Sequence, residues 1–181
     1  DMAAFLREIA GQAPAKDAVG EDVYKLWSRY FLGAKLDLRE AYEWGWAEFF
    51  RVEKEMTAVA ERIKSGSTLA EAAAALDADA RYKVRGRREF EQWMQGLSDT
   101  AMAELRGVHF DIPDELMRLD CRIAPDGGGA GAYYTGPSDD FSRAGAMWWA
   151  LPPGRDEFST WREVSTVYHE GVPGHHLQIA T

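Results

Sequence analysis

Apolar residues recur every three or four positions through residues 1–106, which is the spacing of amphipathic α-helices. The longest run predicts a helix over residues 38–65 with one buried stripe. The apolar positions of this stripe are Ala41, Tyr42, Trp46, Phe49, Val52, Met56, Val59 and Ile63. Shorter runs predict helices over 21–32, 68–76 and 87–106, so we expect residues 1–106 to form a helical region.

Capping signals support two of these helix starts. Asp37 stands three residues before Glu40, and Thr68 stands three residues before Glu71. At this spacing the first side chain and the glutamate each bond the backbone N–H of the other residue, which forms a capping box. The serines and glycine at 65–67 are expected to stop the long helix, because glycine tolerates the backbone conformation of a helix end.

The pattern changes after residue 106. Between residues 108 and 154 a continuous helix is excluded by Pro113, Pro125, Gly127, Gly128, Gly129, Pro137, Pro152 and Pro153. Short apolar runs in this segment predict β-strands over 116–123, 131–134 and 145–151. We therefore expect a small β-sheet on a helical body.

A last helix is predicted to run from an N-cap at Ser159 or Thr160 to residue 170. Residues 107–181 should thus hold the small sheet and this helix. The expected fold class is mainly α, with a small β-sheet next to the last helix. We expect the helical region 1–106 and residues 107–181 to form one structural domain.

The composition is that of a folded globular protein, with 46% apolar and 12% aromatic residues. Acidic residues outnumber basic ones by 30 to 21, which gives a formal net charge of -9. This balance argues against nucleic acid as a partner, because binding it requires clustered lysine and arginine. Since no apolar stretch reaches the length of about 18 residues that a membrane helix needs, we expect no membrane span.

Cys121 is the one cysteine, so an internal disulfide and a cysteine-based zinc site are both excluded. The chain starts with Asp1, Met2 and Ala3 and shows no basic segment followed by an apolar run. Because a secretory leader has that pattern, we expect a cytoplasmic protein. A mature periplasmic or secreted protein would lack the leader as well.

The strongest chemical signal is the segment 169–176, which reads HEGVPGHH. It contains His169, His175 and His176, three of the 4 histidines of the chain, and Glu170 directly follows the first. In the His-Glu-x-x-His motif, two histidines one helical turn apart hold zinc and the glutamate activates a water. Here the second histidine comes two residues late.

A regular helix does not bring these histidines together. The sixth residue after His169 would be rotated by about 120°, and the seventh would lie about 10 Å along the axis. The glycines and proline at 171–174 indicate that the helix swells or breaks there. If residues 172–173 are looped out, His175 takes the place of the second histidine, and His176 faces the substrate or supports a ligand. Ligation by His176, two turns on, is the alternative.

Two imidazoles and a carboxylate favour zinc, which lowers the pKa of a bound water to about 7 and acts as a Lewis acid. Glu170 is the expected general base. Catalytic zinc needs a third protein ligand, and nothing in the spacing of His109, Asp139 or Asp140 recommends them. We expect this ligand to be a downstream glutamate outside residues 1–181, so that these residues alone bind metal weakly and are inactive.

The segment 168–178, YHEGVPGHHLQ, closely resembles a bacterial family known as domain of unknown function 885. The same family is resembled by residues 20–33, 132–134, 142–145 and 147–149. That family is similar to the gluzincin metallopeptidases and to the carboxypeptidase Taq group. The resemblance implies a mostly helical body with a small sheet beside the zinc-binding helix.

The resemblance also implies that this chain is an internal piece of a protein of several hundred residues, whose remainder completes the site. In relatives of this fold a strand beside the zinc helix pairs with the substrate backbone, and by analogy we expect that strand at 147–151. Tyr133, Tyr134 and His176 are then expected at the substrate. Arg143 is also placed among the residues that could bind substrate, through a substrate carboxylate, although a structural salt bridge is the favoured role for it.

Together these features predict a zinc-dependent metallopeptidase, with His169 and His175 as ligands and Glu170 as base. The expected substrate is a peptide or small amide, cleaved from its carboxyl end. A zinc hydrolase of a non-peptide amide or ester would use the same residues. The alternative from another class is a noncatalytic helical binding module, in which the histidines are relict or structural.

Overall fold

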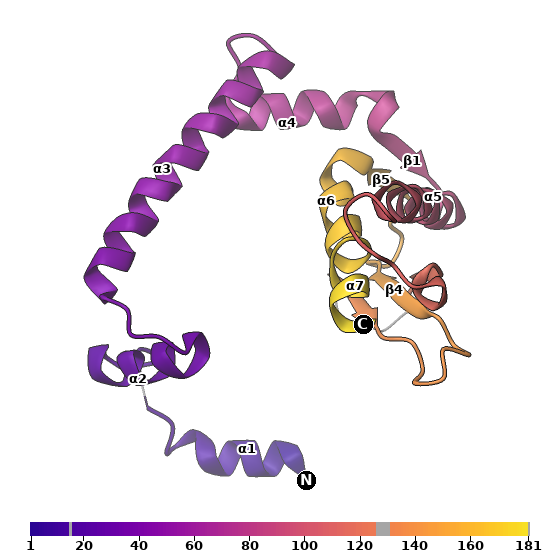
Figure 1. Cartoon of the computed structure of the whole chain (residues 1–181). Coiled ribbons are helices and arrows are strands. Elements are labelled where there is room, and N and C mark those ends of the chain that lie inside the picture. The colour runs from indigo at the N-terminus through magenta and orange to yellow at the C-terminus, as the bar shows by residue number, and fades with distance from the viewer. Residues whose placement is uncertain (15, 126–130, 181) are drawn as a thin grey trace. The chain divides into compact units, whose positions relative to one another are not determined.

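The computed structural model describes residues 1–180 apart from residues 15 and 126–130 (Figure 1). Contacts divide the chain into an N-terminal unit that ends at Val59 and a C-terminal unit that begins at Ala60. The prediction that the whole chain forms one structural domain stays a prediction. Within the described residues, no helix is both long and apolar enough to cross a membrane.

The N-terminal unit consists of α1 (Met2–Ala10), α2 (Glu21–Leu32) and most of α3 (Leu38–Ile63). α2 has the predicted bounds, and it ends at Gly33 because this residue adopts the left-handed conformation, with φ 67°, that glycine tolerates. α3 is two residues shorter than predicted at its carboxyl end. α1 was not predicted.

The apolar stripe of α3 is present but is not buried. Trp46 and Phe49 are 47% and 55% exposed, and Ala60 is the buried residue among those described for this helix. The prediction of a buried stripe is therefore wrong for the described residues. At the start of the helix, the Asp37 carboxylate accepts the backbone N–H of Glu40 at 3.1 Å, which supplies the first half of the predicted capping box.

The C-terminal unit holds the remaining elements. In chain order they are α4 (Leu69–Ala78), the 3₁₀ turn η1 (Ala80–Tyr82), β1 (Lys83–Arg85), α5 (Arg87–Leu105), the 3₁₀ turn η2 (Asp114–Leu116), β2 (Leu119–Ile123), β3 (Gly131–Thr135), β4 (Gly145–Ala150), β5 (Glu157–Ser159), α6 (Thr160–Glu170) and α7 (His175–Ala180). Both halves of the capping box at Thr68 and Glu71 are present. The three predicted helices of this unit begin and end within two residues of α4, α5 and α6.

Two small sheets form in the described part of this unit. β1 pairs antiparallel with β5, while β4 lies between β2 and β3, parallel to the first and antiparallel to the second. The strands predicted at 131–134 and 145–151 are confirmed as β3 and β4. The strand predicted at 116–123 is shorter because residues 114–116 form η2. The glycines at 127–129 lie outside the described residues. The predicted class, mainly α with a small sheet, is confirmed.

The core lies where α5, the three-stranded sheet and α6 meet. Phe90 of α5 and Phe158 of β5 are fully buried and stack with their ring centroids 4.1 Å apart. This stack fixes the segment that leads into α6. Val167 of α6 and Val172 after it are fully buried in the same core, and Figure 1 shows α6 and α7, in yellow, following one another beside β4.

Asp77, near the end of α4, anchors the start of α6. Its carboxylate accepts hydrogen bonds from Ser159 Oγ at 2.9 Å, Trp161 Nε1 at 3.0 Å and Arg162 at 2.7 Å. The bond from Arg162, above all, holds the pKa of the Asp77 carboxyl well below its usual value. The predicted N-cap position at Ser159 is confirmed, although its hydroxyl bonds Asp77 and not the backbone of α6.

We predict that Asp77→Asn destabilises the protein by about 1–2 kcal/mol at neutral pH, because hydrogen bonds to a charged acceptor are lost. A carboxyl whose pKa is lower in the folded than in the unfolded state stabilises the fold above the unfolded value, about 3.9. This stabilisation disappears as the pH falls through the folded value. The free energy of unfolding should therefore decrease as the pH is lowered from about 4. This decrease should be smaller in Asp77→Asn than in the unaltered protein.

Urea unfolding at several pH values, followed by tryptophan fluorescence, measures this difference. Asp17→Asn is the matched control, because it removes the same charge at an exposed residue. The same pH profile in Asp77→Asn and the unaltered protein would contradict the anchoring role.

Candidate metal centre

Helix α6 carries the first two residues of the motif. Val167 is buried in the core, and three residues later Glu170 is also buried, at 7% exposed. His169 is exposed. The helical period explains this pattern, because residues three apart share a face and adjacent residues are turned by about 100°. The last turn of α6 thus places one buried carboxylate beside one exposed imidazole.

The regular helix ends after Glu170, and α7 begins at His175. Between them the Gly174 N–H donates a hydrogen bond to the Tyr168 carbonyl at 3.1 Å. This carbonyl lies six residues back, whereas in a regular α-helix the acceptor lies four residues back. Residues 172–173 are thus the two that the chain loops out before it returns to helical pairing.

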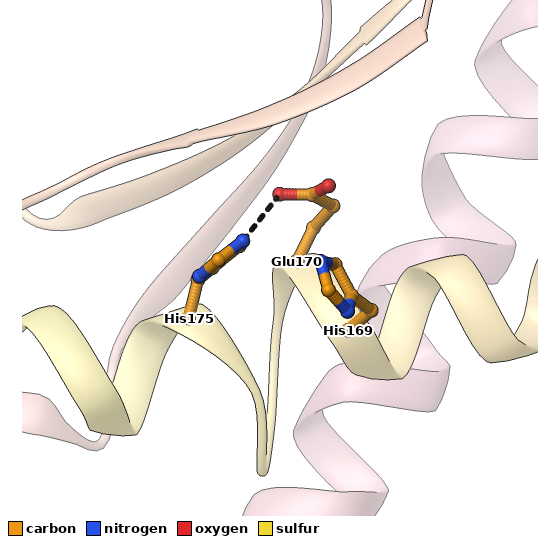
Figure 2. A group of neighbouring side chains, drawn as sticks. All are labelled: His169, Glu170 and His175. Carbon is orange, nitrogen blue, oxygen red and sulfur yellow. Dashed lines mark ion pairs between the residues drawn. The ribbon is translucent and has the colours of Figure 1, made fainter. Parts of the chain in front are cut away.

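The hydrogen bond places His175 one helical turn beyond His169. Gly174 takes the position that the fourth residue after Tyr168 would have in a regular helix. His175 therefore takes the position of the fourth residue after His169. The two imidazole rings lie 4.6 Å apart between centroids, and His175 Nε2 is 3.8 Å from Glu170 Oε2. One ligand atom from each of the three side chains lies within 4.8 Å of the others. Figure 2 shows Glu170 and His175 projecting to the same side across the break.

Both glycines of the break are required by close backbone contacts. A Cβ on Gly174 would overlap the carbonyl group of His169. A Cβ on Gly171 would lie 2.8 Å from the Val167 carbonyl oxygen, which is closer than side-chain carbon atoms approach. The glycines that suggested a bulge in the sequence therefore serve the path of the backbone.

Glu170 supplies the buried negative charge of the site. Within the described part of the chain, no hydrogen bond reaches its carboxylate, whose oxygens keep some access to solvent, and His175 Nε2 lies 3.8 Å away. A buried carboxylate is costly unless it is paired with a cation or hydrogen bonded. The position of this carboxylate therefore suits a cation such as a metal ion.

The three residues fit a divalent metal ion in type and spacing. Zinc binds imidazole nitrogen at about 2.0–2.1 Å and carboxylate oxygen at about 2.0–2.2 Å, so two of its ligand atoms lie roughly 3.4 Å apart in tetrahedral geometry. The 3.8 Å between His175 Nε2 and Glu170 Oε2 is close to this value, so the carboxylate can bind such an ion or stand beside it as a base. Small side-chain rotations would bring His169 to the same centre, since all three ligand atoms lie within 4.8 Å.

Three other residues considered as ligands lie outside this group. Among the described residues, the group that could hold a metal ion consists of the two histidines and the glutamate above, without His109, Asp139 or Asp140. The Asp140 carboxylate instead accepts hydrogen bonds from the hydroxyls of Ser138 at 2.7 Å and Ser142 at 2.8 Å.

His176 is fully buried and is bonded at both ring nitrogens. Nε2 donates to the Leu116 carbonyl at 2.7 Å, and Nδ1 accepts from the Tyr134 hydroxyl at 2.9 Å. This assignment follows because a carbonyl only accepts, which leaves Nδ1 without a proton. Burial lowers the pKa of the His176 imidazole and raises the pKa of the Tyr134 hydroxyl, so both groups are neutral at neutral pH. The structure thus brings His175, and not His176, beside His169 and Glu170.

Gly145, at the start of β4, makes room for this contact and was not predicted as a site residue. A Cβ on it would overlap the Tyr134 hydroxyl and lie 3.0 Å from His176 Nδ1. A glycine within a strand often marks such a close approach, and this was the signal available in the sequence. Leu116 takes part through its backbone carbonyl, for which the sequence carries no signal.

Tyr133 and Arg143, both predicted at the substrate, are accessible. Tyr133 is 44% exposed and stacks on Trp148 with centroids 6.2 Å apart. It faces the opposite side of the sheet from Tyr134, because successive strand residues alternate. No described carboxylate forms an ion pair with Arg143, whose guanidinium donates to the Ala144 carbonyl at 3.4 Å. The favoured structural salt bridge is therefore wrong for the described residues.

The strand predicted as the substrate edge lies in the centre of its sheet. β4 pairs with β2 on one side and with β3 on the other, so both of its hydrogen-bonding sides are occupied. The prediction that residues 147–151 pair with a substrate backbone is therefore wrong. The edge strands are β2 and β3, and of these two β3 makes the more extensive contact with α6.

Comparison with known proteins identifies a family for this chain. The family model described as "Bacterial protein of unknown function (DUF885)" matches residues 1–181. The resemblance found in the sequence is thereby confirmed, whereas the similarity to gluzincin metallopeptidases stays a prediction. A search of curated proteins finds no match.

We predict that Gly174→Ala destabilises the protein by about 1–3 kcal/mol, because the new Cβ overlaps the His169 carbonyl and the break must shift. Gly96→Ala is the matched control. Gly96 lies exposed in α5 with open space around it, so this change should stabilise the protein by about 0.5–1 kcal/mol. Urea unfolding measures both, and equal stability of the two variants would contradict the close contact.

Proposed function

The chain belongs to the family of bacterial proteins of unknown function (DUF885), and we propose that it carries the metal site of a zinc-dependent hydrolase. One observation carries the proposal: His169, Glu170 and His175 offer ligand atoms within 4.8 Å of one another. The proposed reaction is the hydrolysis of a peptide, as in the metallopeptidases that the motif resembles.

His169 and His175 are the proposed metal ligands. They stand one helical turn apart, as in the uninterrupted motif, because the hydrogen bond from Gly174 to Tyr168 absorbs the two extra residues. His169 is exposed and the His175 side chain is 39% exposed, so both rings can be reached by a metal ion and by a substrate. His176 has no nitrogen free for this role.

Glu170 is the proposed general base. Zinc, when bound, supplies Lewis acidity, which polarises a substrate carbonyl and lowers the pKa of water. The Glu170 carboxylate accepts a proton from the attacking water as the new carbon–oxygen bond forms. It then passes a proton to the leaving amine as the carbon–nitrogen bond breaks. Its burial keeps the carboxylate in place beside the ligand rings.

We further propose that a carboxylate from outside residues 1–181 completes the metal site. With Glu170 acting as base, the described group supplies two imidazole ligands, whereas catalytic zinc takes three protein ligands and keeps one position for water. The segment that supplies this carboxylate is the proposed partner of this chain at the site.

Arg143 is the proposed contact for the substrate carboxylate. Its guanidinium donates to the Ala144 carbonyl at 3.4 Å and forms no ion pair among the described residues, so its charge is available to a ligand. Arginine binds carboxylates through two parallel hydrogen bonds. A peptide bound by its terminal carboxylate would be cleaved from that end.

We predict that Glu170→Gln in the natural protein retains zinc but loses peptide hydrolysis by about 100- to 10,000-fold, because the general base is removed. His175→Ala should lose both zinc and hydrolysis, since a ligand is removed. Metal content after dialysis and the cleavage of a mixture of short peptides, followed by mass spectrometry, measure the two effects.

His109→Ala is the matched control, because this exposed histidine lies outside the metal group and should keep both properties. Loss of zinc in Glu170→Gln would make Glu170 a ligand. Retained hydrolysis in that variant would exclude it as the base. If the natural protein carries no zinc and is unaffected by chelators, the proposed hydrolase function is contradicted and a binding module is favoured.

We also predict that Arg143→Gln raises the KM for peptides with a free carboxyl end by about 10- to 100-fold, which corresponds to a lost hydrogen bond between charged groups. Peptides with an amidated carboxyl end lack the charge that Arg143 binds, so their KM should be high and unaffected by the substitution. Steady-state kinetics on matched peptide pairs tests this. Equal hydrolysis of free and amidated peptides by the unaltered protein would contradict the role.

A further inference from the structure

Helix α7 is too short to hold His175 in place by itself. It has 6 residues, His175–Ala180, and isolated helices of this length are unstable in water. Its orientation must therefore come from contacts with the rest of the unit. The buried residue of this helix is His176, which is fully enclosed and bonded at both ring nitrogens.

The two hydrogen bonds of His176 fix the rotation of α7. They come from different elements, since Leu116 belongs to η2 and Tyr134 to β3. A planar ring held at both nitrogens can neither flip nor tilt freely. Consecutive residues of a helix are about 100° apart, so a fixed His176 also fixes the direction of His175. In that direction His175 meets Glu170 at 3.8 Å.

We infer that Tyr134 and His176 are positioning residues, which hold His175 at the metal site through the hydrogen-bond chain from β3 to η2. This inference rests on the proposed function, because it gives the chain a role in metal binding. It replaces the predicted role of both residues in direct substrate contact. The Tyr134 hydroxyl and both His176 nitrogens are already engaged inside the protein.

Gly145 takes part in the same set of contacts. Its missing side chain lets the Tyr134 hydroxyl lie against the backbone of β4, where a Cβ would overlap it. β4 is the central strand of the sheet, so its backbone is held on both sides and offers a fixed support. The position of His175 is thereby tied to the sheet as well as to α6.

The direct test replaces Tyr134 by phenylalanine in the natural protein. Tyr134→Phe keeps the ring but removes the donor to His176 Nδ1, so His175 should be less well oriented. The affinity for Co²⁺ should fall about tenfold or more, as for other residues that orient a metal ligand. The visible spectrum of bound Co²⁺, which depends on ligand geometry, should change. Tyr133→Phe is the matched control, because it makes the same change on the opposite face of the sheet and should alter neither.

A second variant tests the contact at Gly145. Gly145→Ala should weaken Co²⁺ binding in a similar way, because the Cβ displaces the Tyr134 hydroxyl. In the Tyr134→Phe background the same change should weaken binding less, since the hydroxyl to be displaced is absent. This non-additivity indicates that both substitutions act through one contact. Urea unfolding confirms that each variant is folded under the conditions of measurement.

The outcomes separate this inference from the function on which it rests. Unchanged Co²⁺ affinity and spectrum in a folded Tyr134→Phe variant would overturn the positioning role and leave the metal site standing. Reduced stability with an unchanged spectrum would overturn it too, because the contact would then serve packing alone. Failure of the unaltered protein to bind zinc or Co²⁺ would overturn both.

Discussion

The hydrogen bond from the Gly174 N–H to the Tyr168 carbonyl is the interaction on which the site depends. It lets the chain loop out two residues and return to helical pairing, so that His175 stands one turn beyond His169. Without it, six residues of regular helix would turn the two imidazoles to different faces. Gly174 is the residue type that this hydrogen bond requires, because a side chain would overlap the His169 carbonyl.

The rest of the C-terminal unit holds the two sides of this break in place. On one side, Asp77 and the stacked rings of Phe90 and Phe158 fix the segment that begins α6. On the other side, the bonds of His176 fix α7. The buried Val172 ties the loop itself to the core. The candidate metal site is thus supported by contacts that reach α4, α5 and the sheet.

The local features of the site could be predicted from the sequence, because helix periodicity and the behaviour of glycine and proline depend on neighbouring residues. The break at 171–174 and the proximity of His175 to Glu170 follow from such rules. The central place of β4 could not be predicted, because strand order depends on distant segments. For the same reason β1 and β5, with 3 residues each, left no pattern. The bond from His176 to the Leu116 carbonyl involves a backbone atom, which carries no residue identity.

The central claim is that this break builds a metal site in which His169 and His175 bind the metal and Glu170 does not. A crystal structure of the zinc-loaded natural protein, with anomalous diffraction measured at the zinc edge, tests it most directly. The account predicts a zinc peak at about 2.0–2.1 Å from one nitrogen of each histidine, with the Glu170 carboxylate beyond bonding distance. A peak bonded to His176, or no peak beside His169, would contradict it.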